Sequence, residues 1–260
     1  MKTIFRVGVV FVMISCILSC ATYQRIKIGR VLPRESFVKL QKLLTVSFCD
    51  KSKKLCSSQK FASAASGVVV KRNSKGAFIL TAEHVCSNKF LERFRGKPYL
   101  LGFNALDIRG NKHSVTVVNT NQQHDLCLLW SRNFLAPAAP ISEYPSEIGD
   151  KVYNLAAPAG IANKSMIPIF EGYNSGPFGD SIAYSIPATG GSSGSPIFNK
   201  NGQIVGMIHS AFTRFPMLSL SARHDVLKQF IESTILEYEK RLFFNDVLNL
   251  LETMNTLFSC

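Results

Sequence analysis

The sequence predicts an all-β protein with a helical C-terminal tail. Ten short apolar runs are separated by turn signals, with little helical periodicity between them, and this pattern is typical of β-barrels and β-sandwiches. Near Ser221 the pattern changes, and apolar residues begin to recur at helical spacing. At 260 residues, with 46% hydrophobic residues, the chain can bury one sizeable core or two small ones.

The expected strands share an apolar, often β-branched composition and are bounded by Gly, Pro, Asn or Ser. They are Leu43–Phe48, Ser66–Val70, Ala77–Thr81, Tyr99–Phe103, Ser114–Val118, Leu126–Trp130, Lys151–Leu155, Ile182–Ile186, Ile204–Ser210 and Met217–Leu220.

Two helices are expected after these strands. The first covers Arg223–Phe243 and is expected to pack on the β-structure, and the second runs from Asp246 onward. Asn245 and Asp246 are expected to cap the second helix, whose apolar face either packs within the chain or docks a partner.

The first twenty residues have the pattern of an export signal. Lys2 and Arg6 precede an apolar run, Val7–Leu18, that is too short to span a bilayer comfortably but suits a signal peptide. The run ends in ILSC (Ile17–Cys20), which resembles the lipobox of bacterial lipoproteins, and this resemblance implies lipid modification of Cys20. An uncleaved signal anchor and an ordinary cleaved signal are the alternatives. All three place the folded part outside the cytoplasm, either lipid-anchored on the periplasmic side of a bacterial envelope or secreted.

Five of the seven cysteines lie beyond this signal, in a chain expected to reach a disulfide-permissive compartment. Cys49 and Cys56 flank a short polar segment, so we expect a bridge that closes a hairpin loop. No group of Cys and His residues has zinc-site spacing, so we expect neither a metal nor a cofactor.

The net charge of +13 is spread along the chain and does not form one basic run. Such a charge makes an anionic membrane surface or an envelope polyanion a candidate partner. Nucleic acid is not expected as a partner, because the chain has a single Trp, no reader motif and an export signal.

Three separate segments carry residue types that suit acyl transfer. His84 lies in TAEHVC (Thr81–Cys86), directly after an expected strand, and Asp125 lies in HDLCLL (His124–Leu129), at the start of another. A lone carboxylate entering a core strand needs a hydrogen-bonding partner, and a histidine ring is a natural one. Ser193 lies in GSSGSP (Gly191–Pro196), where a tight turn would expose its hydroxyl and aim the N–H groups of Gly191 and Ser193 into one oxyanion hole.

The chain order His, Asp, Ser in an all-β exported chain resembles the chymotrypsin-fold, trypsin-like serine proteases. The sequence pattern is most similar to those of bacterial envelope proteases of the high-temperature-requirement type and of glutamyl endopeptidases. The resemblance includes SGVV (Ser66–Val69) and GQIVG (Gly202–Gly206). It implies two six-stranded antiparallel Greek-key barrels, with His84 as the base, Asp125 as its orienting carboxylate and Ser193 as the nucleophile.

The same resemblance implies where substrate binds, and here the sequence departs from the family pattern. Ser192 stands where proteases activated by cleavage keep an acidic residue, so we expect no such activation switch. No carboxylate lies just before the loop, so cleavage after Lys or Arg is not expected, while His209 suggests cleavage after Glu. The alignment gives a pocket for a small or medium apolar side chain. The implied substrate-binding residues are Ala188, Thr189, His209, Ser210 and Ala211, with Met217 as a further wall.

Cys86 and Cys127 each follow an expected catalytic residue by two positions. They either form a bridge that braces the base against its carboxylate or remain two buried thiols.

The sequence therefore predicts an exported serine endopeptidase that acts on proteins or peptides. The expected domains are a signal peptide with lipobox (1–20), a basic tether (21–36), a trypsin-like protease domain (37–231) and a C-terminal helical extension (232–260). The alternative is a catalytically idle envelope protein that binds peptides or polyanions on the same fold.

Overall fold

The computed structural model describes residues 32–50 and 55–257. The predicted signal peptide, the lipobox with Cys20, most of the basic tether and Cys260 lie outside the described residues. None of the helices in the described part combines the length and hydropathy that a membrane span requires.

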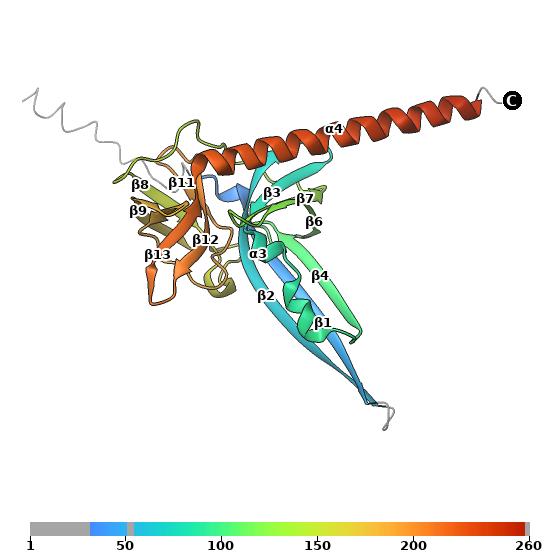
Figure 1. The fold of residues 1–260 in the computed structure, drawn as a ribbon, viewed down its shortest axis with the longest axis horizontal. Helices are drawn as coiled ribbons and strands as arrows, with labels where there is room; N and C mark the ends of the chain where they lie inside the picture. Colours follow the sequence, from blue (N-terminus) through green and yellow to red (C-terminus); the bar gives the residue numbers. More distant parts are fainter. Residues whose placement is uncertain (1–31, 51–54, 258–260) are drawn as a thin grey trace, which may run out of the picture. The chain divides into compact units, whose positions relative to one another are not determined.

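Strands form two antiparallel sheets (Figure 1). The first sheet has seven strands in the order β5-β4-β1-β2-β3-β7-β6, and the second is a closed six-stranded barrel in the order β10-β13-β12-β11-β8-β9. The strands of the first sheet are β1 (Phe37–Asp50), β2 (Leu55–Arg72), β3 (Gly76–Thr81), β4 (Tyr99–Leu106), β5 (Lys112–Ser114), β6 (Thr116–Asn121) and β7 (Leu126–Arg132). Those of the barrel are β8 (Lys151–Leu155), β9 (Ile169–Phe178), β10 (Ser181–Tyr184), β11 (Pro196–Phe198), β12 (Ile204–Phe212) and β13 (Phe215–Ala222).

Short helical turns precede or connect these strands, and one long helix follows them. The turns are η1 (Arg34–Ser36), α3 (Glu83–Cys86), η2 (Lys89–Phe94) and η3 (Pro158–Gly160), and the long helix is α4 (His224–Leu257). The turn α3 directly follows β3, so the backbone of a buried strand fixes the position of His84.

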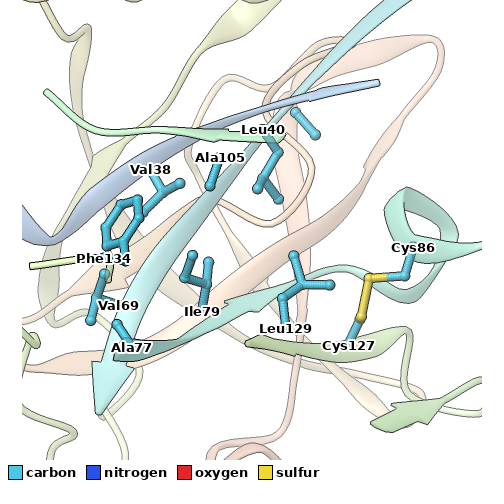
Figure 2. Close-up of a cluster of buried hydrophobic side chains, with 11 residues drawn as sticks. Val38, Leu40, Val69, Ala77, Ile79, Cys86, Ala105, Cys127, Leu129 and Phe134 are labelled. Carbon is cyan, nitrogen blue, oxygen red and sulfur yellow. A yellow bond between two sulfur atoms is a disulfide. The ribbon is translucent and has the colours of Figure 1, made fainter. Parts of the chain in front are cut away.

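The core of the first sheet is a cluster of buried apolar side chains from β1, β2, β3, β4 and β7 (Figure 2). Leu40, Ile79 and Leu129 are almost completely buried there, and each such side chain stabilises the fold by about 1.5–3 kcal/mol. Figure 2 shows the Cys86–Cys127 disulfide at one end of this cluster. The closed barrel has its own core, which contains Val152 and Ile197.

The predicted all-β, chymotrypsin-like class is confirmed. All ten expected strands lie within or overlap observed strands, and the first sheet has seven strands because Lys112–Ser114 adds a short edge strand. Two observed strands, β9 and β11, were not expected.

The prediction of two C-terminal helices is wrong, because α4 is continuous through Asn245 and Asp246. Neither residue is a Gly or a Pro, so nothing at that point forces the backbone out of a helix.

Candidate active site

His84 and Asp125 meet at the junction between α3 and β7. The Nδ1 atom of the His84 ring lies 2.7 Å from Oδ2 of Asp125, and the backbone N–H of His84 donates to Oδ1 at 2.9 Å. The backbone N–H of Glu83 also donates to the Asp125 carbonyl, at 3.1 Å. These three contacts fix the ring against the carboxylate and leave Nε2 as the ring nitrogen that faces away from it.

The backbone of Asp125 has a φ of 52°, in the left-handed region that non-glycine residues rarely adopt. This conformation lets the side chain turn back towards α3 at the start of β7. A strained backbone of this kind persists only where surrounding contacts hold it, and such positions cluster at functional sites.

Burial and hydrogen bonding set the ionisation of this pair. The hydrogen bond that the His84 ring donates to Asp125 raises the pKa of His84 above its ordinary value, and this effect outweighs the opposing effect of burial. Burial opposes ionisation of Asp125, yet hydrogen bonds from the ring and backbone of His84 hold its pKa below the ordinary value. The carboxylate is therefore ionised at neutral pH and stabilises a protonated imidazole beside it.

The loop that carries Ser193 is held by backbone hydrogen bonds to three neighbouring elements. The backbone N–H of Ser66, on β2, donates to the Ser193 carbonyl at 2.9 Å, and the Ser66 hydroxyl donates to the Gly191 carbonyl at 2.8 Å. The N–H of Ala159 in η3 donates to the Gly190 carbonyl, and the N–H of Gly194 donates to Ile208 of β12. The loop is thus a braced turn and not a flexible connector.

Two glycines in this loop occupy positions where a side chain would not fit. Gly191 and Gly194 have φ values of 98° and 83°, so both are in the left-handed region. A Cβ at Gly194 would overlap Thr81 and the Ser66 carbonyl, and one at Gly191 would overlap the Ala157 carbonyl.

The three serines of the loop have different surroundings. Ser192 and Ser195 are buried, and their hydroxyls accept hydrogen bonds from the Thr189 N–H and the Asn154 amide, respectively. Ser193 is half-buried and lines two cavities, one of which it shares with His84. No hydrogen bond joins its hydroxyl to the His84 ring within the described residues, and such contacts often tighten only when substrate binds.

Some backbone N–H groups near Ser193 donate hydrogen bonds within the fold, and others do not. The N–H groups of Ser192, Gly194 and Ser195 all donate within the fold. Those of Gly191 and Ser193 have no acceptor among residues 32–50 and 55–257. Two free, neighbouring N–H groups beside a hydroxyl are what an oxyanion hole requires.

A cavity of about 320 Å³ adjoins Ser193 on the side of β12. Four of the residues predicted to bind substrate line it: Ala188, Thr189, Ser210 and Ala211. Its lining contains no carboxylate and neither His209 nor Met217. Apart from Gly190, the side chains of this lining are thus apolar or hydroxylated.

His209 lies on β12 and is not among the residues that line this cavity. Its Nε2 lies 3.4 Å from the hydroxyl of Ser181, and burial lowers its pKa, while Asp125 opposes this effect electrostatically. His209 thus interacts with Asp125 electrostatically, and it does not line the cavity that contains Ala188.

Two disulfides are present in the described residues. Cys49–Cys56 closes the β1–β2 hairpin, as predicted, and Cys86–Cys127 joins α3 to β7. Of the two alternatives for Cys86 and Cys127, the structure has the bridge. It joins the segment that carries His84 to the segment that carries Asp125. Disulfides indicate an oxidising, extracellular or periplasmic compartment.

Sequence reasoning missed the role of Ser66. Its hydroxyl also accepts from the Ala157 N–H at 2.9 Å, so one side chain joins β2, η3 and the loop of Ser193. The signal available in the sequence was the small residue at the start of an apolar run, but its partners lie far away along the chain.

Comparison with known proteins agrees with this geometry. A model of the trypsin-like peptidase domain matches residues 65–207, more than half of the chain. A crystal structure of the serine endoprotease from Yersinia pestis superposes with a TM-score of 0.57 at 18% identity. The match covers 80% of this chain and 65% of that one. At this identity the superposition shows a shared fold. A search of curated proteins found no match.

The matched residues include His84, Asp125, Ser193 and the whole braced loop that carries Ser193. The predicted relationship to chymotrypsin-fold serine proteases is thereby confirmed at the level of the family. The chain belongs to the family of trypsin-like serine peptidases.

Proposed function

We propose that this chain is an exported serine endopeptidase that uses His84, Asp125 and Ser193 as its catalytic triad. The observation that carries the proposal is the His84–Asp125 pair, at 2.7 Å, beside a cavity that also contains Ser193. Asp125 holds the ring by Nδ1, which leaves Nε2 to accept the Ser193 proton.

The reaction follows from this arrangement. Ser193 Oγ attacks the peptide carbonyl and its proton moves to Nε2 of His84, while the N–H groups of Gly191 and Ser193 stabilise the oxyanion. The C–N bond then breaks, His84 protonates the leaving amine, and an acyl-enzyme remains on Ser193. Water repeats the sequence with His84 as the base, which releases the carboxylic acid and restores the serine.

The cavity lined by Ala188 and Ala211 supports a preference for a small or medium apolar side chain before the cleaved bond. A cationic substrate side chain would find no carboxylate there. His209 lies outside this lining, which weakens the idea of cleavage after Glu.

Hydrolysis of an unfolded protein substrate tests the proposal. The protein without its export signal is expected to cleave it, and Ser193→Ala is expected to abolish cleavage. Ser192→Ala is the matched control in the same loop and should retain activity, because its hydroxyl only accepts a bond from Thr189. A folded wild-type protein without hydrolytic activity on any peptide or ester would favour an idle binding protein.

We further propose that Cys20 carries a lipid anchor. The ILSC pattern supports this, and the disulfides agree with an exported chain. Expression in a bacterium with Cys20→Ala should move the protein from the membrane fraction to the soluble fraction. An unchanged distribution would contradict the anchor.

A further inference from the structure

A second cavity, of about 280 Å³, adjoins Ser193 on the side of His84. His84, Gly191 and Ser193 line it, and Phe90 and Phe103 contribute apolar walls. The cavity beside Ala188 includes Ser193 but not His84. Because His84 must protonate the leaving amine, the cavity on its side is where the segment after the cleaved bond would lie.

A buried lysine forms part of this second cavity. The side chain of Lys42, on β1, is 7% exposed and its ammonium lies over the Phe103 ring, 4.9 Å from the ring centroid. Its Nζ donates to the carbonyls of Cys86 and Ser87, at 3.1 and 2.8 Å, and to Oδ1 of Asn88 at 3.2 Å.

All three acceptors of Lys42 are neutral oxygens, so the positive charge has no paired carboxylate. Among residues 32–50 and 55–257, no carboxylate forms an ion pair with it, and Glu83 acts only at longer range. Burial accordingly lowers the pKa of Lys42 to about 8, against the weaker opposing effect of Glu83. A buried cation without a counter-charge favours an anionic ligand in the same cavity.

One of the three acceptors can be exchanged for a ligand. Asn88 is exposed and makes the longest of the three contacts, whereas the other two acceptors are backbone carbonyls, one at the last residue of α3 and one directly after it. A substrate carboxylate that replaces the Asn88 amide oxygen would turn a neutral hydrogen bond into a charge-assisted one.

We infer that this cavity is a leaving-group subsite in which Lys42 selects substrates with Asp or Glu at one of the first two positions after the cleaved bond. The inference rests on the proposed peptidase function, and it adds a substrate class to it. The apolar cavity beside Ala188 would select the residue before the bond, and Lys42 would select the residue after it.

Matched peptides test this subsite. Once a cleaved peptide is known, versions with Glu or Gln at each of the two following positions are compared by kcat/KM. The wild-type protein is expected to prefer Glu over Gln about tenfold at one of these positions at pH 7. Asn88→Asp supplies an internal counter-charge, and it is expected to bring the ratio close to one. Lys42→Met should do the same.

Lys89→Met is the matched control, because it removes an exposed charge from the same segment and should leave the ratio nearly unchanged. A Glu/Gln ratio of one at both positions in the wild type would overturn the inference, and so would Asn88→Asp with an unchanged ratio. If Lys42→Met slows all peptides equally at an unchanged ratio, Lys42 only positions the segment after His84, which also overturns it.

A small activated ester separates this inference from the function on which it rests. Its leaving group does not reach Lys42, so ester hydrolysis reports on Ser193 and His84 alone. Ester hydrolysis with a Glu/Gln ratio of one contradicts only the subsite. The absence of both ester and peptide hydrolysis contradicts the peptidase and the subsite together.

Discussion

At the scale of single residues, His84 and Asp125 have the ionisation that a base and its orienting carboxylate need. Hydrogen bonding between them raises the pKa of His84. Burial alone would raise the pKa of Asp125, but the hydrogen bonds from His84 lower it below the ordinary value. The neutral ring is the active form of a general base. Activity should therefore be present above the pKa of His84 and be lost as the pH falls through it.

Asp125→Asn tests the role of this carboxylate. We expect kcat to fall by about 10⁴-fold at neutral pH, since the amide cannot stabilise the imidazolium or hold the correct tautomer. The acidic limb of the rate profile should also move to lower pH, because loss of the carboxylate lowers the pKa of His84.

Asp107→Asn is the control for this change, because Asp107 lies 3.8 Å from another histidine, His113, in a separate part of the fold. It should alter neither kcat nor the pH profile. An Asp125→Asn protein with a profile like that of the wild type would contradict the pairing.

Ser66 provides a second test at this scale. Ser66→Ala removes the donor to the Gly191 carbonyl and the acceptor of the Ala157 N–H, which leaves two buried backbone groups unpaired. We expect the free energy of unfolding to fall by about 1–3 kcal/mol, together with a lower kcat. Ser58→Ala, at an exposed position of the same strand, should change neither quantity by a comparable amount. Equal effects of the two substitutions in chemical denaturation would contradict this role.

At the scale of elements, the site depends on how separate segments are tied together. The Cys86–Cys127 disulfide joins α3 to β7, close to His84 and Asp125, across 41 residues of chain. The bridge therefore fixes the two elements that position the proposed base and its carboxylate.

Replacing both cysteines with alanine should lower the free energy of unfolding by about 4 kcal/mol, from the loop-closure entropy alone. The corresponding change at Cys49 and Cys56 closes a shorter loop and should cost about 2.5 kcal/mol. The first pair should also reduce kcat, and the second should not. A loss of kcat in both double variants would contradict the assignment of the first bridge to the site.

The sequence predicts some elements well and others poorly, for physical reasons. Strands β3 and β7 are continuous apolar runs buried on both faces, so their burial is visible in composition. Strand β9 contains Gly172, Gly176 and Pro177, which read as a loop, and only its pairing with β8 and β10 makes it a strand. Local patterns carry no information on such pairings.

The residues of the candidate site were likewise predictable only in part. His84, Asp125 and Ser193 lie in short segments whose composition is distinctive. Ser66 and Lys42 were not found, because their partners are backbone carbonyls and amides in segments distant along the chain. The position of His209 depends on the side to which β12 turns its side chain, and the sequence alone does not determine that side. In the structure His209 does not line the cavity beside Ala188.

At the scale of the whole molecule, the two sheets hold different parts of the candidate site, and helix α4 packs on one of them. Ser66 lies on β2 of the first sheet, and His84 and Asp125 lie in segments next to β3 and β7. The closed barrel supplies β12 and the strands on either side of the Ser193 loop. Helix α4 packs on the first sheet through Tyr238, whose ring contacts Phe78 and Trp130. Further along, Phe243 and Phe244 are 67% and 64% exposed.

A shortened chain tests this division. Ending the chain after Lys240 should leave kcat unchanged and lower the free energy of unfolding by less than about 1 kcal/mol, because Phe243 and Phe244, which the truncation removes, are exposed. Tyr238→Ala should cost about 2–3 kcal/mol through lost aromatic packing. Fluorescence of Trp130, the single tryptophan, reports unfolding in both variants. A larger loss from the truncation than from Tyr238→Ala would contradict this account.

In the proposed mechanism, Ser193 is a nucleophile activated by His84. Treatment of the folded protein with a fluorophosphonate tests it directly, because this reagent phosphonylates activated serines. We expect one adduct on the peptide that contains Ser193, no adduct in Ser193→Ala, and much slower labelling in His84→Ala. A folded wild-type protein without the adduct, or with the adduct on Ser192 or Ser195, would contradict it.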